Sequence, residues 1–182
     1  WADSELPVLR ELQLLTQKPV LYGANVKEEE LPNGGPLVDR VREIAAKENS
    51  KVAVISGKVE MEVAELSEEE AVLYLKELGL VEPGLHQLIR LGYELLGLIT
   101  FLTAGEDEVR AWTIHKGDKA PQAAGVIHTD FERGFIRAEI MKYNDLVQMG
   151  SQAAVKDKGL YRIEGKEYVM ADGDVVYFRF NV

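Results

Sequence analysis

Apolar residues in the first half of the chain follow two patterns. Residues 19–24 and 52–55 are short apolar runs that each end at a polar residue, which is typical of strands buried on both faces. Between these runs, apolar residues recur at the spacing of one helix face, namely at Leu37, Val38, Val41, Ile44 and Ala45. The order strand, loop, helix, strand predicts an α/β architecture in which the two strands run parallel.

Further helices are indicated by their start and stop signals. A helix is expected to run to about Leu15 with Asp3 or Ser4 as its cap, and another is expected to cover residues 83–96. Capping boxes, in which a Ser or Thr and a Glu three residues later satisfy the first backbone N–H groups, mark two more helix starts. They are Ser67 with Glu70, and Thr129 with Glu132.

After Leu96 the pattern changes to short strands separated by glycine-containing turns. The expected strands are residues 98–103, 109–114, 135–142, 161–163, 166–170 and 175–180. Strands with one or two short helices between them indicate an α+β unit with a mixed sheet. We therefore divide the chain into two domains, residues 1–96 and residues 97–182.

Composition restricts the class of protein. Hydrophobic residues make up 46% and charged residues 29% of the 182 positions, as in ordinary soluble domains. No apolar run reaches the roughly 18 residues that a membrane-spanning helix needs. The chain has no Cys, which argues against disulfides, and its three His residues are scattered, which argues against a metal site. The first residue is not Met, which suggests part of a longer protein.

Charge is distributed unevenly along the chain. The net charge of -10 comprises 10 Lys+Arg against 18 Asp+Glu in residues 1–94, and 11 against 13 in residues 95–182. So acidic a chain is not a general DNA binder, because binding to the phosphate backbone depends on cationic side chains. The nearly neutral second part can still carry a local basic face.

The first candidate site combines the ends of the two predicted parallel strands. Asn25-Val26-Lys27-Glu28 follows the first strand and Ser56-Gly57-Lys58 follows the second. Ligands of open α/β sheets bind at the carboxyl ends of strands, so both segments would face one crevice. An Asn amide both donates and accepts hydrogen bonds, so it can connect a purine edge to a neighbouring loop.

The identity of the base follows from a comparison with the N-K-x-D motif of GTPases. In that motif the Asp accepts two hydrogen bonds from guanine and the Lys stem covers the ring. Here Val26 and Glu28 occupy those two positions, which disfavours guanine and favours adenine read by backbone groups of Val26. The alternative is that Asn25 merely closes a strand and Glu28 is a solvated loop charge.

The second half holds a further candidate surface. Arg110, Lys116, Lys119, Arg133 and Arg137, with aromatic residues between them, could form one RNA-binding face. The alternative is a mixed-charge surface over a core. The segment Asp172-Gly173-Asp174 resembles a cation-binding loop, but a turn is the simpler interpretation because no further ligand spacing follows.

Several longer segments resemble one known family, the YchF-type Obg-like ATPases. In the second half these are residues 101–105, 109–114, 119–139 and 172–182, which resemble the family's TGS domain. In the first half, residues 14–19 and 25–28 resemble the point where the family's chain returns from a helical insertion into its nucleotide domain. The resemblance covers essentially the whole chain.

The resemblance implies a fold for each domain. Residues 1–96 would be the C-terminal, base-recognition part of a P-loop G-type domain, and residues 97–182 a TGS domain of the β-grasp, ubiquitin-like type. It also implies a cytoplasmic, monomeric ATPase that uses ATP with Mg²⁺ in preference to GTP. The implied partners are the ribosome and ribosomal RNA, with no membrane contact and no DNA specificity.

The resemblance also assigns residues to the nucleotide site. Asn25, Val26 and Glu28 match the family's N-x-x-E motif, which replaces N-K-x-D. Ser56 and Gly57 match its second base-side loop, where the family usually has Ala in place of this Gly.

The sequence departs from the family pattern in one important respect. It contains no G-x-x-x-x-G-K-[ST] loop and no D-x-x-G motif after a strand. The phosphate-binding, Mg²⁺-binding and catalytic residues are therefore expected outside these 182 residues, and the chain alone is expected to be inactive. The alternative function is an RNA-, ribosome- or protein-binding module without hydrolytic activity.

Overall fold

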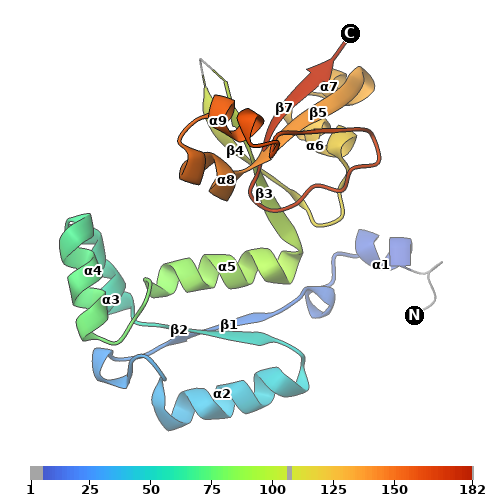
Figure 1. Cartoon of the computed structure of the whole chain (residues 1–182). Coiled ribbons are helices and arrows are strands. Elements are labelled where there is room, and N and C mark those ends of the chain that lie inside the picture. Colours follow the sequence, from blue (N-terminus) through green and yellow to red (C-terminus); the bar gives the residue numbers. More distant parts are fainter. Residues whose placement is uncertain (1–5, 106–107, 182) are drawn as a thin grey trace. The chain divides into compact units, whose positions relative to one another are not determined.

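The computed structural model describes residues 6–105 and 108–181 and divides into two compact units, Trp1–Leu96 and Gly97–Val182 (Figure 1). A two-stranded sheet lies in the first unit and a five-stranded sheet in the second. Within the described ranges, no helix combines the length and the apolar character that crossing a bilayer requires.

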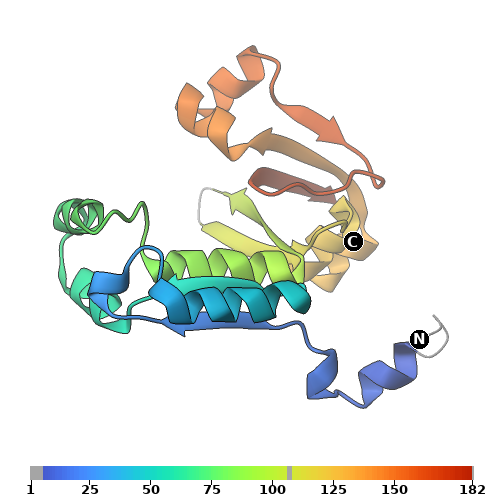
Figure 2. The same cartoon turned by 90° about the horizontal axis from the view of Figure 1, so that it is seen from below.

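The first unit is organised around two parallel strands. Strands β1 (Leu21–Asn25) and β2 (Lys51–Ile55) pair along their whole length, from Leu21 opposite Lys51 to Asn25 opposite Ile55. Helix α2 (Gly35–Lys47) connects them and lies on one face of the pair, whereas α5 (Gly84–Leu96) lies on the other (Figures 1 and 2). The predicted parallel strand–helix–strand arrangement is confirmed.

The remaining helices of the first unit are short. They are α1 (Leu6–Glu11), the 3₁₀ turns η1 (Leu15–Gln17) and η2 (Glu28–Glu30), α3 (Gly57–Glu65) and α4 (Glu68–Glu77). The capping box at the start of α4 is confirmed, because the Ser67 hydroxyl accepts a hydrogen bond from the Glu70 N–H at 3.4 Å while the Glu70 carboxylate accepts from the Ser67 N–H at 3.0 Å.

Two predictions for the first unit need correction. The first helix ends at Glu11 rather than near Leu15, because the backbone enters the left-handed region at Gln13, whose φ is 47°. The caps expected for this helix, Asp3 or Ser4, lie outside the described residues. Helix α3 was not predicted at all: Gly57, interpreted as a loop residue, is the first residue of that helix.

The second unit contains one mixed sheet in the order β4-β3-β7-β5-β6. Its strands are β3 (Leu98–Ala104), β4 (Val109–His115), β5 (Phe135–Lys142), β6 (Arg162–Glu164) and β7 (Asp174–Phe180). Neighbouring strands are antiparallel except β3 and β7, which are parallel and pair Leu102 with Val175. The mixed sheet predicted for this half is therefore confirmed.

Short helices cover both faces of this sheet. Helices α6 (Ala120–Ile127) and α7 (Thr129–Arg133) pack on one face, over a core that includes Phe101, Ile140 and Phe178. Helices α8 (Tyr143–Met149) and α9 (Gln152–Asp157) pack on the other face, over a smaller core that includes Met141 and Val175. Side chains therefore alternate between two cores along β5 and β7.

The structure differs from the prediction at three places in the second unit. Residues 166–170 are not a strand, and only Val169 forms a bridge, with Lys119. Thr129 does not cap α7: the cap is His128, whose Nδ1 accepts from the Asp130 N–H at 3.2 Å. Helices α6, α8 and α9 were not predicted individually, because their 8, 7 and 6 residues are too few for an apolar repeat to be recognised.

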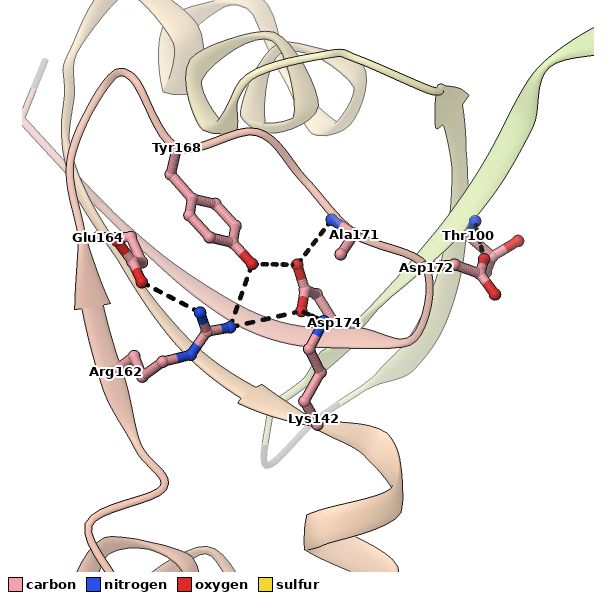
Figure 3. A network of polar contacts seen from close by, with 8 residues as sticks. All are labelled: Thr100, Lys142, Arg162, Glu164, Tyr168, Ala171, Asp172 and Asp174. Atoms are coloured by element: carbon pink, nitrogen blue, oxygen red, sulfur yellow. Dashed lines mark hydrogen bonds and ion pairs between the residues drawn. The ribbon is translucent and has the colours of Figure 1, made fainter.

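A buried carboxylate at the start of β7 joins several segments of this unit (Figure 3). Asp174 is fully buried; it accepts hydrogen bonds from Lys142 Nζ at 2.7 Å, the Tyr168 hydroxyl at 2.9 Å and the Ala171 N–H at 2.9 Å. Arg162 Nη2 lies 3.9 Å from the same carboxylate. Burying an ionised carboxylate is costly unless it is paired and hydrogen-bonded, as it is here.

Polar contacts within the protein also account for the conformation of residues 172–174, the candidate cation-binding segment. Asp172 accepts a hydrogen bond from the Thr100 N–H at 2.8 Å, and Gly173 has a φ of 73°, so the segment is a turn fixed by protein contacts (Figure 3). Within the part of the chain that the structure describes, no group of three or more acidic, His or Cys side chains could hold a metal ion.

Replacing Asp174 with Asn tests how much the network of polar contacts around this carboxylate contributes to the stability of the fold. The variant keeps the size of the side chain but leaves Lys142 without its anion, so we expect a loss of roughly 2–3 kcal/mol in the free energy of unfolding. Guanidinium chloride unfolding of the 182-residue chain would measure it, with Asp157→Asn on the exposed end of α9 as the control. Equal stability of the two variants would contradict this role.

Candidate functional site

The ends of β1 and β2 are joined by a hydrogen bond between an amide side chain and a backbone N–H. Asn25 Oδ1 accepts from the Gly57 N–H at 2.9 Å, across 32 positions of sequence. The Val26 N–H also donates to the Ile55 carbonyl at 2.8 Å, which extends the strand pairing by one residue. The two segments predicted to meet at one edge of the sheet are therefore in direct contact.

The parallel register explains why these residues meet. Because Asn25 lies opposite Ile55, the residues that follow the two strands leave the sheet side by side. Ser56 then precedes α3 at the N-cap position, and Gly57 begins the helix. Adding a Cβ to Gly57 would place it 3.6 Å from Asn25 Oδ1, an ordinary contact, so the Ala that the resemblance leads us to expect at this position would also fit.

Ser56 is the most buried of the predicted base-site residues. Only 2% of it is exposed, and its hydroxyl has no hydrogen-bond partner among the described residues. It also lines a cavity of about 230 Å³ together with Leu31, Glu60 and Gly84. The other four predicted residues do not line this cavity, so it is a neighbour of the Asn25–Gly57 contact rather than the same space.

An ion pair forms a second connection between the two strand ends. Lys58 Nζ lies 2.9 Å from Glu28 Oε2 and 3.6 Å from Glu62 Oε1. The hydrogen bond from Lys58 to Glu28, with the charges of Glu28 and Glu62, raises the pKa of Lys58. Glu28 is therefore ion-paired rather than a free charge, and Lys58, which the sequence placed in the second segment without a role, is its partner.

The partner of Glu62 extends this network to α4. The Tyr74 hydroxyl donates to Glu62, and this hydrogen bond is the main cause that raises the pKa of Tyr74 to about 12. Residues from η2, α3 and α4 are thereby linked beside the strand ends. Only the spacing of Lys58 and Glu62, four residues apart on one helix, could have been noticed in the sequence.

Hydrogen bonds within the protein already use some of the donors at this edge. The N–H groups of Val26 and Gly57 already donate within the protein, so of the backbone groups of Val26 that were expected to read the base, the N–H is not available. The Val26 carbonyl can accept from the exocyclic amine of adenine, and the Asn25 amide keeps its NH₂ group as a donor. Among the described residues, no cluster of three or more acidic, His or Cys side chains could hold Mg²⁺.

The basic residues predicted to bind RNA do not all share one face. The guanidinium of Arg110 lies 4.1 Å from the centre of the Trp112 ring, and Trp112 packs on the core under α6 and α7. Arg137 instead contacts Glu139 at 3.1 Å, and Glu139 accepts from Tyr161, which packs on the opposite core. The prediction of a single face is therefore wrong for Arg137, because side chains alternate along β5.

The other three basic residues lie at the ends of elements. Lys116 follows β4, Lys119 precedes α6 and Arg133 ends α7. Lys119 Nζ lies 2.5 Å from Glu167 Oε2, so part of its charge is neutralised. All three side chains are exposed and accessible to a partner.

Glu139 is a second buried carboxylate that the sequence did not indicate. It is 7% exposed and accepts hydrogen bonds from Arg179 Nε at 3.0 Å and from the Tyr161 hydroxyl at 2.9 Å, besides its contact with Arg137. Arg179 is the main cause that lowers the pKa of Glu139 to about 2. Arg137 and Arg179 thus stabilise the fold through this acid.

Comparison with known proteins places these features in a family. The model of the YchF GTPase C-terminal family (YchF-GTPase_C), described as "Protein of unknown function (DUF933)", matches residues 98–181. The solved structure of the Schizosaccharomyces pombe YchF GTPase matches 98% of this chain with a TM-score of 0.83 and 40% identity, over 48% of that protein. The mixed α/β fold with its sheets is therefore similar to that of a YchF protein.

Curated relatives give the same result over the full length of the chain. The ribosome-binding ATPase YchF of Bacillus subtilis is 54% identical over all of this chain and 50% of that protein. Obg-like ATPase 1 of Gallus gallus is 45% identical over all of this chain and 46% of that protein. The chain belongs to the YchF family of Obg-like ATPases, and it spans about half the length of the curated relatives it matches.

The lowered pKa of Glu139 predicts how the free energy of unfolding changes at acid pH. Its pKa is about 2 in the folded chain against an ordinary value of 4.5, so the unfolded chain takes up the proton first as pH falls. The stabilisation should be complete above about pH 4.5 and disappear as pH falls towards 2. Glu139→Gln should therefore flatten the loss of unfolding free energy across this window.

Unfolding curves between pH 2 and pH 7 would measure this effect. At neutral pH the variant should be less stable than the wild type by about 1–3 kcal/mol, because two guanidinium groups lose their anion. Asp157→Asn, which removes an exposed carboxylate, should leave the pH profile unchanged. A Glu139→Gln variant with the wild-type pH profile would rule out the proposed charge on Glu139.

Proposed function

We propose that this chain is the base-recognition and TGS part of a cytoplasmic ATPase that prefers ATP to GTP and works on the ribosome. The observation that carries the proposal is the hydrogen bond between Asn25 and Gly57 at the carboxyl ends of two parallel strands. Ligands of open α/β sheets bind at this position. The name of the Bacillus subtilis relative, a ribosome-binding ATPase, supports the same function for the whole protein.

Adenine is the base that best fits the groups at this edge. A guanine site needs a carboxylate free to accept from the ring N–H and the exocyclic amine side by side. Here the carboxylate of Glu28 is engaged by Lys58 at 2.9 Å. The Val26 carbonyl and the Asn25 amide are suited to the donor and acceptor edge of adenine.

The rest of the nucleotide domain is proposed to lie in the part of the relatives that this chain does not match. Two parallel strands are a small fraction of an α/β sheet, since such sheets are normally larger and covered on both faces. Large apolar side chains of the first unit are also exposed, including Leu37, Val72, Val81 and Ile89. Phosphate binding, Mg²⁺ coordination and hydrolysis are assigned to that other part.

The second unit is proposed to be a TGS domain of the β-grasp type. Its strand order, β4-β3-β7-β5-β6 with β3 and β7 parallel in the centre and α6 packed across one face, supports this assignment. We assign the weak contact with ribosomal RNA to Arg110, Lys116, Lys119 and Arg133, without Arg137. The protein is proposed to act as a monomer without membrane contact or DNA specificity.

A second candidate function follows from the sequence itself. No phosphate-binding loop is present in these 182 residues. If the chain acts alone, it is an RNA-, ribosome- or protein-binding module without hydrolytic activity. The purified chain should therefore release no phosphate from ATP above background, whereas a longer protein with the phosphate-binding half should do so.

Base preference is the most direct test of the nucleotide proposal. In a protein that includes the phosphate-binding half, ATP should bind about tenfold more tightly than GTP, a difference of roughly 1.4 kcal/mol. The double change Val26→Lys with Glu28→Asp restores the residues of a guanine site and should shift the preference towards GTP. Titration calorimetry would measure both affinities.

The control for this experiment is a pair of equal changes away from the site. Val8→Lys with Glu11→Asp, on exposed positions of α1 ahead of the start of β1, changes the charge by the same amount and should leave both affinities unaltered. Equal ATP and GTP affinities in the wild-type protein would refute the proposal.

The RNA proposal is tested with the basic residues that remain after Arg137 is excluded. Changing Lys116, Lys119 and Arg133 to Glu should weaken co-sedimentation with ribosomes by about tenfold or more at moderate salt and leave the affinity for ATP unchanged. It should also reduce the salt dependence of binding, because each lost phosphate contact removes about one released counterion.

The matched control changes three exposed basic residues of the first unit, Arg40, Lys47 and Lys76, to Glu. This variant has the same net charge as the test variant, so it separates a local contact from bulk repulsion. If both variants, or neither, lose co-sedimentation at several salt concentrations, the TGS surface is not the ribosome contact.

A further inference from the structure

Lys58 occupies an unusual position between two acidic side chains. Its ammonium group lies 2.9 Å from Glu28 Oε2 and 3.6 Å from Glu62 Oε1. The second contact is an ordinary pair of residues four apart on one helix. The first spans 30 positions of sequence and joins α3 to η2, directly beside the hydrogen bond from Gly57 to Asn25. Helix formation alone does not require this contact.

The contact has a consequence for the recognition of a base. The reading edge of guanine presents two donors, the ring N–H and the exocyclic amine, which a free carboxylate can accept together. The corresponding edge of adenine presents an acceptor nitrogen next to an amine donor, and an unpaired carboxylate repels that nitrogen. The charge state of Glu28 alone therefore does not decide the preference, because what matters is whether its carboxylate is free or already paired.

We propose that Lys58 determines base selectivity at this site by holding the carboxylate of Glu28 in an ion pair. This role rests on the proposed function, in which the strand ends bind a purine base. Engagement of Glu28 Oε2 occupies one of the two oxygens that guanine needs side by side, and the lysine charge offsets the negative charge that adenine would meet. Lys58 acts on the base through Glu28, so it is a positioning residue rather than a catalytic one.

The surroundings of Lys58 favour this arrangement. Lys58 is the second residue of α3, so the helix fixes its backbone next to Gly57. Glu62 is in turn held by the Tyr74 hydroxyl, which keeps a second anion one helical turn away. Two carboxylates near one ammonium group keep the lysine charged and raise its pKa. The side chain is 67% exposed, so replacing it should not disturb the core.

The proposal is tested by nucleotide affinities in a protein that includes the phosphate-binding half. Titration with ATP and with GTP would be compared for the wild type, Lys58→Met and the double variant Lys58→Met with Glu28→Gln. Lys58→Met frees Glu28, so the Kd for GTP should fall about fivefold and the Kd for ATP should rise, within the range of an exposed ion pair. The double variant removes the freed carboxylate, and its Kd for GTP should return to the wild-type value or above.

Lys47→Met, at the end of α2, is the matched control because it removes the same charge from an exposed position away from the strand ends. It should leave both affinities unchanged. Thermal unfolding would establish that all variants are folded.

The possible outcomes separate this proposal from the proposed function. Weak or equal binding of ATP and GTP by the wild-type protein would overturn the proposed function itself. A wild type that prefers ATP, together with a Lys58→Met variant whose two affinities are unchanged or fall by the same factor, would overturn only the role of Lys58. A gain in GTP affinity that persists in the double variant would also overturn it, because the gain would not depend on Glu28.

Discussion

The hydrogen bond from the Gly57 N–H to Asn25 Oδ1 is the contact on which the candidate site depends. It forms because β1 and β2 are parallel and in register, so that Asn25 lies opposite Ile55 and the chain leaves both strands at the same edge. An Asn is suited to this position because its amide accepts from one neighbour and still donates to another. The ion pair of Glu28 and Lys58 then forms beside this contact, and the two together fix the polar groups at the edge where we propose that a base binds.

The second unit is stabilised by a different kind of interaction, in which buried carboxylates pair with cationic side chains and hydroxyl groups. Asp174 connects the start of β7 to Lys142 at the end of β5 and to Tyr168 in the segment before β7. Glu139, on β5, connects to Arg179 on the neighbouring strand β7 and to Tyr161 ahead of β6. Pairing makes such burial tolerable, and the loss of one partner is costly because the remaining charge stays partly buried. The basic residues that pair with these carboxylates, Lys142 and Arg179, therefore stabilise the fold.

The sequence predicted best what depends on local pattern. Parallel β1 and β2, the capping box of α4 and the meeting of the Asn25 and Gly57 segments at the strand ends follow from apolar spacing and from where these residues occur. Contacts between distant segments could not be predicted in this way. Nothing in the sequence pairs Lys58 with Glu28, and the placement of Arg137 depends on the register of β5 with β7, which sequence spacing does not reveal. Helices as short as α8 and α9 were missed because tertiary packing, rather than helical periodicity, maintains them.

The central claim is that the joined ends of β1 and β2 hold an adenine base. The most direct measurement is a crystal structure of a protein that contains this chain and the phosphate-binding half, with a non-hydrolysable ATP analogue. We expect the exocyclic amine of the adenine to donate to the Val26 carbonyl, while the bonds between Asn25 and Gly57 and between Glu28 and Lys58 remain in place. A base bound elsewhere, or one that breaks the hydrogen bond between Asn25 and Gly57 in order to bind, would contradict the account.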